Sequence, residues 1–210
     1  MHINQVTKGS IQSSARFIIN MILPIVTYGH KILRQKCKET DSHYPNLDKL
    51  IDDMWETLYP AGGSGLAAPQ VNHSIKLFIV DSKEIYDRMK PDERAEFFDG
   101  DKGISETFIN ARINAYSNRV WIEEEGCLSI PTLSEVVERS WDISIEYFNK
   151  DFQKQVKTYS GVTARVIQHE YDHTMGKLYL DYVNPLKRKL LNKKLAKITK
   201  GEIKTRYRMK

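Results

Sequence analysis

Two histidines four residues apart, with a glutamate after the first, carry the strongest chemical signal in this 210-residue sequence. They are His169 and His173, and the run from the first to the second reads His-Glu-Tyr-Asp-His. On a helix such residues lie one turn above each other, so both imidazoles would reach one metal ion. Glu170 would point beside that metal, toward a bound water. The competing interpretation is a chance pair of histidines on a solvated helix face.

A catalytic metal held by two histidines needs a third protein ligand that leaves one position open for water. Three downstream residues fit poorly: Tyr179 stands where the longer zincin peptidase pattern has a histidine, Asp181 follows the helix too closely, and Glu202 lies in a basic stretch. Cys127 remains, and the preceding Gly126 would allow a close backbone approach. A lone cysteine is more often a small buried hydrophobe, so the residues alone leave Cys127 as a candidate.

Two stretches of helical periodicity would position these groups. Residues 47–58 repeat apolar side chains at helical spacing, which predicts an amphipathic helix that stops at Pro60 and the glycines Gly62, Gly63 and Gly65. Residues 162–175 form a second predicted helix, ended by Gly176. Its core-facing stripe starts with valines and ends with the two histidines. Buried imidazoles need partners, and a metal would satisfy both.

Several strands are predicted around these helices. Residues 75–80 read as a buried strand and residues 21–26 as an edge strand. Apolar and polar side chains alternate in residues 141–147, as in a strand with one solvated face, and a turn leads into another strand at residues 152–159. This order predicts an α+β fold in which antiparallel β-sheets pack around a central helix, the one that carries the His-Glu-x-x-His motif.

Composition favours one domain, since 210 residues with 40% hydrophobic content build a single sizeable core. We expect an N-terminal extension at residues 1–20, a metal-dependent catalytic domain at residues 21–186 and a basic C-terminal tail at residues 187–210. The charged residues 81–103 read as a surface insertion. The early apolar residues 17–26 fall far short of the ~20 residues that span a bilayer, so we expect no membrane association. The use of only two cysteines is typical of the reducing cytoplasm.

Charge is distributed unevenly along the chain. The net charge is +5, but residues 187–210 hold eleven Lys or Arg against one acid, a local charge of +10, which leaves −5 for residues 1–186. Such asymmetry points to a polyanionic partner for the tail. A solvated helix face is the alternative explanation.

Three separate runs resemble the signature motifs of a known family. Residues 63–70 read Gly-Ser-Gly-Leu-Ala-Ala-Pro-Gln, residues 125–129 read Glu-Gly-Cys-Leu-Ser, and residues 168–173 read Gln-His-Glu-Tyr-Asp-His. Together they look like the three motifs of peptide deformylase, in the family's order and at comparable separations. The similarity extends over residues 21–181. It implies an enzyme that hydrolyses the N-formyl group from the N-terminal formyl-methionine of newly made proteins, giving formate and a free methionine amine.

The resemblance also implies roles for individual residues. Cys127, His169 and His173 would hold one divalent metal; ferrous iron (Fe2+) is favoured, and Zn2+, Ni2+ or Co2+ also suit these ligands. Glu170 would take a proton from the attacking water and pass it to the departing amine. The oxyanion would be held by the metal, by the backbone N–H of Leu128 and by the side-chain amide of Gln70. The residues expected along the substrate backbone are Gly63, Gly65 and Leu66.

Two positions depart from the family pattern, and they concern the pocket for the methionine side chain. Ser64 and Glu123 stand where the family usually has apolar residues. In some deformylases a C-terminal helix contacts the ribosome, so the basic tail is expected to meet ribosomal RNA phosphates. N-formyl-methionyl nascent chains are the expected substrate, and no stable protein partner is predicted. The rival hypotheses are a zincin-type endopeptidase with another third ligand and a noncatalytic ribosome-binding protein.

Overall fold

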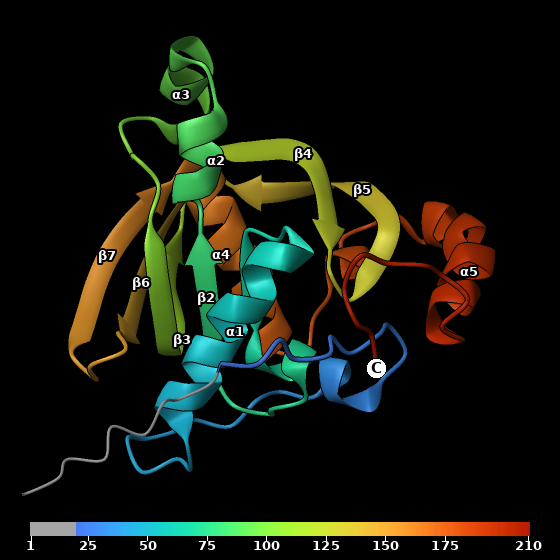
Figure 1. The fold of residues 1–210 in the computed structure, drawn as a ribbon. Coiled ribbons are helices and arrows are strands. Elements are labelled where there is room, and N and C mark those ends of the chain that lie inside the picture. Colours follow the sequence, from blue (N-terminus) through green and yellow to red (C-terminus); the bar gives the residue numbers. More distant parts are fainter. Residues whose placement is uncertain (1–19) are drawn as a thin grey trace, which may run out of the picture.

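A computed structural model describes residues 20–210 and shows two sheets with helices between and around them (Figure 1). Residues 1–19, nearly all of the expected N-terminal extension, lie outside the described part. Within residues 20–210, no helix has the length and apolar character needed to cross a membrane.

The larger sheet has five antiparallel strands in the order β1-β2-β3-β6-β7. Their bounds are Gly65–Ala67 for β1, Leu77–Asp81 for β2, Ser105–Tyr116 for β3, Asp142–Phe148 for β6 and Lys154–Ser160 for β7. The predicted alternation is confirmed in β6, where Ile143, Ile145 and Tyr147 are buried and the side chains between them are half-buried. The predicted strand at 75–80 corresponds to β2, which is buried at every position.

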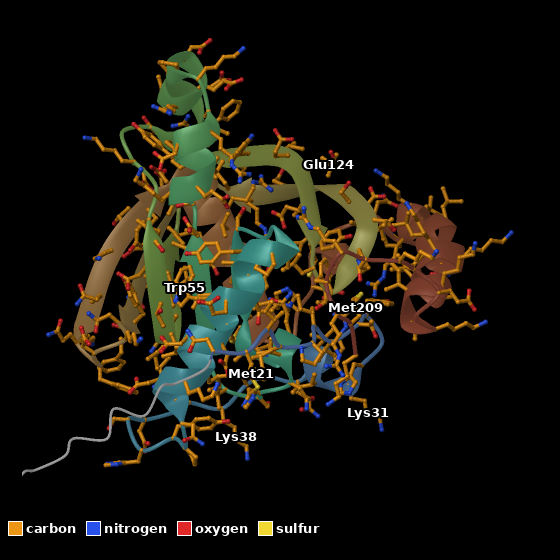
Figure 2. The ribbon with its side chains drawn as sticks, in the orientation of Figure 1. Met21, Lys31, Lys38, Trp55, Glu124 and Met209 are labelled. Carbon is orange, nitrogen blue, oxygen red and sulfur yellow. The ribbon has the colours of Figure 1, made fainter. Side chains whose placement is uncertain are left out.

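Helices cover both faces of this sheet. Leu77 and Ile79 of β2 pack with α1 (Leu47–Ala61), whereas Phe78 and Val80 pack in the core cluster that includes α4 (Gly161–Thr174). Because neighbouring side chains of a strand point to opposite faces, β2 must be apolar throughout. On the α1 side, the Trp55 indole also donates a hydrogen bond to Thr107 of β3, at 3.4 Å (Figure 2).

The second sheet is a two-stranded antiparallel hairpin formed by β4 (Val120–Cys127) and β5 (Ile130–Ser140). Besides its contacts with β1 and β2, α4 contacts β5, so it lies between the sheets (Figure 1). The expected α+β arrangement around a central helix is therefore confirmed.

The remaining helices lie toward the outside. The charged excursion folds into α2 (Lys83–Arg88), which has no buried residue, and α3 (Pro91–Phe98), whose Phe98 is fully buried. Within residues 20–210, the other helical elements are three short 3-10 turns and α5; their bounds are η1 Lys31–Arg34, η2 Ala68–Val71, η3 Tyr179–Asp181 and α5 Pro185–Thr199. Buried Leu195 and Ile198 fix α5 against the β4–β5 hairpin, so the basic residues 187–210 are packed on the body.

One local prediction needs correction and another is confirmed. Residues 21–26 are not an edge strand: Ile25 makes only an isolated bridge, to Met209, because the Met21 and Leu23 N–H groups donate to side chains of α1. The predicted helix does stop at Pro60 and the glycines: it runs through Ala61, one residue past Pro60, and Gly62 ends it in the left-handed conformation.

Candidate active site

The central helix α4 places its motif in the interior. Glu170 and His173 are buried, and Ala164 and Ile167 anchor the helix in the core beside the large sheet. The helix starts at Gly161 with φ +53, and a Cβ there would lie 2.0 Å from the carbonyl oxygen of a neighbouring residue in α3. Only glycine fits this contact, which fixes where α4 begins.

Cys127 meets both histidines at the end of β4. One ligand atom from each of Cys127, His169 and His173 lies within 4.8 Å of the others. The Cys127 Sγ is 3.3 Å from the Nε2 of His173. The geometry thus brings the sequence-predicted thiol to the two imidazoles, a donor set that suits a divalent transition metal.

Two buried polar atoms in this cluster have no hydrogen-bond partner within the described chain. They are Oε2 of Glu170 and Nδ1 of His173. Burial raises the pKa of the Glu170 carboxyl to about 7 and lowers that of His173 well below its usual range. A neutral imidazole is the form that binds metal. The unpartnered carboxylate oxygen, beside the three candidate metal ligands, could accept a hydrogen bond from a water molecule in the site.

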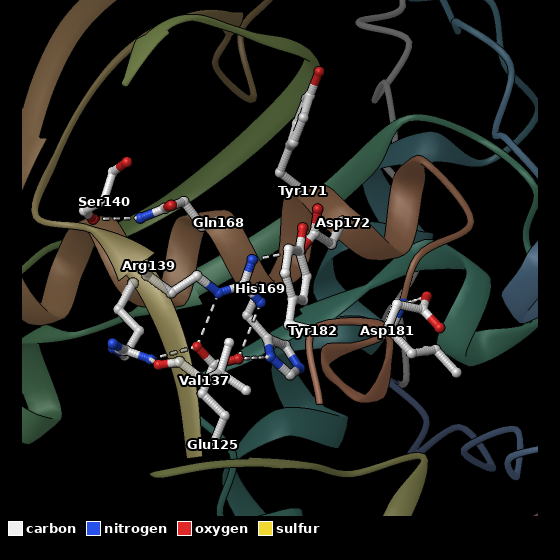
Figure 3. Close-up of polar contacts among 12 residues, drawn as sticks. Glu125, Val137, Arg139, Ser140, Gln168, His169, Tyr171, Asp172, Asp181 and Tyr182 are labelled. Carbon is white, nitrogen blue, oxygen red and sulfur yellow. Dashed lines mark hydrogen bonds and ion pairs between the residues drawn. The ribbon is translucent and has the colours of Figure 1, made fainter. Parts of the chain in front are cut away.

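A buried ion network orients the first histidine (Figure 3). Glu125 accepts hydrogen bonds from Nδ1 of His169 at 3.0 Å, from Arg139 at 2.9 and 3.0 Å, and from Arg165 at 2.6 Å. Arg139 also donates to Asp172. With Nδ1 engaged, His169 presents Nε2 to the cluster.

The charge of Glu125 is stabilised by these donors. Burial by itself would raise the pKa of Glu125, but hydrogen bonds from His169 and Arg139 outweigh it and hold the pKa well below its usual range. The carboxylate therefore stays ionised between two buried arginines.

Gln70 is held so that its amide N–H2 faces the thiol. Its Oε1 accepts a hydrogen bond from the Ala67 N–H at 2.7 Å, while its Nε2 lies 3.6 Å from the Cys127 Sγ and 3.4 Å from Ser129 Oγ. Since the oxygen is already engaged, the nitrogen is the group available to a ligand at the cluster.

A cleft of about 1030 Å³ opens over the cluster. It is lined by most of the sequence-predicted site residues, namely Gly63, Gly65, Gln70, Cys127, Leu128, His169 and Glu170. His173 lies beneath this surface, 1% exposed, and Leu66 is fully buried in the core. A Cβ at Gly65 would lie 2.6 Å from Glu170, so the β1 backbone passes directly over the Glu170 carboxyl group.

Sequence reasoning gave no role to Glu125, Arg139 or Arg165. One signal was present: along β5, Arg139 occupies a position in phase with buried Leu133 and Val137, where a charge requires a partner. Three groups of lining residues were also missed: Ile85, Met89 and Phe97 from the α2–α3 excursion, Trp121 from β4, and residues 204–207 after α5.

A buried helical His-Glu-x-x-His motif, joined by a thiol beneath an open cleft, defines a metal-dependent hydrolase. The sequence model of the polypeptide deformylase family matches residues 22–189. A peptide deformylase of Christiangramia forsetii is 45% identical over 190 residues, which cover 90% of this chain and 96% of that protein. One from Flavobacterium psychrophilum is 46% identical over 192 residues, with 90% and 97% covered. The chain therefore belongs to the polypeptide deformylase family.

Solved structures agree with this assignment. A peptide deformylase from Plasmodium falciparum aligns with a TM-score of 0.71 and 30% identity, covering 84% of this chain and 95% of that one. One from Legionella pneumophila also gives 0.71, with 31% identity and coverage of 86% and 97%. The expected activity, removal of the formyl group from newly made proteins by a metalloenzyme, is confirmed at this level.

Proposed function

We propose that this chain deformylates its substrate at a single metal held by Cys127, His169 and His173. The convergence of their three ligand atoms within 4.8 Å, beside buried Glu170, is the observation that carries the proposal. When bound there, a divalent metal acts as a Lewis acid and lowers the pKa of a coordinated water toward neutrality. Ferrous iron is the proposed native metal because the family resemblance favours it, since a thiolate with two imidazoles also suits Zn2+, Ni2+ or Co2+.

Glu170 is the proposed proton carrier. Its unpartnered Oε2 accepts a proton from the attacking water, and its pKa of about 7 lets it release that proton to the departing amine near neutral pH. Gln70 Nε2 and the Leu128 N–H are the proposed donors to the oxyanion that forms at the formyl carbon. The backbone at Gly63 and Gly65, on the cleft surface, would lie along the substrate.

The test is formate release from formyl-Met-Ala-Ser by protein prepared anaerobically with ferrous iron. Wild type should release formate, and Glu170→Gln should lose at least about 100-fold in kcat, because general acid–base catalysis is worth 10²–10⁴-fold. The matched control is Glu138→Gln, an exposed residue of β5, which should retain full rate. Equal rates in wild type and Glu170→Gln, at equal metal content, would exclude Glu170 as the proton carrier.

The metal proposal has its own test. Reconstitution of the chelated protein with Fe2+, Zn2+, Ni2+ or Co2+, one at a time, should give the highest kcat/KM with Fe2+. Cys127→Ser should reduce stoichiometric binding of each metal, because a hydroxyl replaces a thiolate ligand. Full metal content in Cys127→Ser would point to another third ligand and favour the endopeptidase hypothesis.

We also propose that α5 contacts ribosomal RNA and that the protein acts in the cytoplasm. Leu186 and Leu190 are 73% and 82% exposed on α5, among exposed lysines. The positively charged lysine side chains of α5 suit binding to the phosphates of ribosomal RNA. The two cysteines are free, as expected of a reducing compartment.

Triple charge reversal tests the ribosome proposal. Lys189→Glu/Lys193→Glu/Lys197→Glu on α5 should abolish cosedimentation with ribosomes at low salt. The matched control reverses Lys150, Lys154 and Lys157, which are exposed on the β6–β7 hairpin, and should leave binding intact. If both triple variants bind as wild type does, α5 is only a solvated helix.

A further inference from the structure

The chain after α5 returns to the active-site cleft. Residues 204–207 line the cleft together with the Gly62–Gly65 loop and the loop at Leu128 (the two signature loops). Figure 1 shows this stretch, in red, running back from α5 to end beside the blue segment near residue 25. These residues lie beyond the match to the family model, which ends at residue 189.

Backbone pairing fixes the end of this stretch. The Ile25 N–H donates to the carbonyl of Arg208, and the Lys210 N–H donates to the carbonyl of Ile25, each at 2.9 Å. The Thr27 N–H donates to Lys210 at 3.0 Å. Met209 stands opposite Ile25 in this bridge (Figure 2).

The paired segment is itself tied to both motifs. The Val26 N–H donates to the carbonyl of Gln70, and the Tyr28 N–H donates to that of Ser129, each at 2.8 Å. The returning chain is therefore built onto the same framework that holds the catalytic loops.

Two side chains of the returning stretch bond to the two sides of the cleft, one to the end of α1 just before Gly62 and the other to the loop at Leu128. Arg206 donates from Nε at 3.0 Å and from Nη2 at 2.7 Å to the carbonyl of Ala61. Its guanidinium covers Gly62, where a Cβ would lie 1.6 Å from Nη2. The Tyr207 hydroxyl donates to the carbonyl of Leu128 at 2.7 Å. Neighbouring residues thus bond to opposite loops of the cleft.

We propose that Arg206 and Tyr207 are positioning residues that set the separation of the two signature loops. The proposal rests on the proposed function, in which Gly63, Gly65 and Leu128 contact the substrate. The Arg206 guanidinium, which donates twice to the Ala61 carbonyl, holds the end of α1, and the Tyr207 phenol holds Leu128. The distance between the two loops therefore stays the same whether or not substrate is bound. Reacting groups must be held within about 0.5 Å of productive geometry, and small misplacements are costly in rate.

The test compares single variants in the formyl-Met-Ala-Ser assay. Arg206→Ala and Tyr207→Phe should each lower kcat/KM by about tenfold, the loss expected for one charge-assisted or part-buried hydrogen bond, chiefly through a higher KM. Arg206→Lys keeps one donor and should recover part of the loss. The matched control is Arg208→Ala, since the exposed Arg208 contributes only its backbone to these contacts, and it should behave as wild type.

Melting temperature and metal content separate positioning from general destabilisation. The proposal requires a raised KM in Arg206→Ala and Tyr207→Phe at unchanged metal content and with melting within a few degrees of wild type. It is overturned if both keep kcat/KM within twofold of wild type, or if the loss appears equally in Arg208→Ala and follows the melting temperature. Wild type serves as the reference: if it releases no formate, the proposed function fails first.

Discussion

Replacing Glu125 by glutamine should damage both stability and metal binding. Glu125 is 6% exposed and accepts four hydrogen bonds from three side chains, two of them arginines buried with it. Glutamine keeps one acceptor oxygen and turns an amide donor toward the remaining donors. Removing one partner of a buried ion pair costs about 3–5 kcal/mol, so we expect the free energy of unfolding to fall by that amount.

The same change should loosen His169, whose ring Glu125 orients. Loss of such a supporting partner typically weakens metal affinity by about 10–100-fold. The free energy of unfolding is measured by urea denaturation with chelator present, because bound metal would add its own stabilisation. Metal affinity is measured separately, by competition with a chromogenic chelator. Glu135→Gln is the control: this carboxylate, on β5, is also buried but pairs with exposed Lys187, so we expect a loss of at most about 1 kcal/mol. A Glu125→Gln protein within about 1 kcal/mol of wild type and with unchanged metal affinity would refute the reasoning.

Further predictions concern other contacts. After chelation, iodoacetamide at pH 8 should label Cys127 but not Cys37, because Cys37 is 4% exposed and burial raises its pKa to about 11. Bound metal should protect Cys127 from labelling. Equal labelling of both thiols, measured by mass spectrometry, would contradict this prediction. Gly65→Ala should lose activity with little change in melting temperature, since its Cβ would displace Glu170; full formate release would contradict the contact. Gly161→Ala should instead lower the melting temperature markedly, and an unchanged thermal transition would show that α4 can shift.

The two candidate histidine ligands and the central helix that carries them were predictable because the information is local. His169 and His173 follow one helical period, and β6 alternates apolar and polar residues with period two. The hairpin that supplies Cys127 was not predicted. Buried positions of β5 include the charged Glu135 and Arg139, which hide the alternation of apolar residues that would mark a strand.

Long-range partnerships account for the rest. Glu125 and Arg165 are 40 residues apart in sequence, and no spacing rule pairs them. The apolar run at residues 21–26 resembles a strand, but its backbone bonds go largely to α1 side chains and to the returning chain near residue 208. The two helices of residues 81–103 lack a strong apolar stripe, since α2 buries nothing.

The contact between α3 and Gly161 links a peripheral segment to the chemistry. Phe97 of α3 lines the cleft, and its carbonyl oxygen lies against Gly161, the first residue of the helix that carries both histidines. An insertion or deletion near residue 97 would therefore move the start of α4. The three side chains that α4 supplies to the candidate site, those of residues 169, 170 and 173, would move with it.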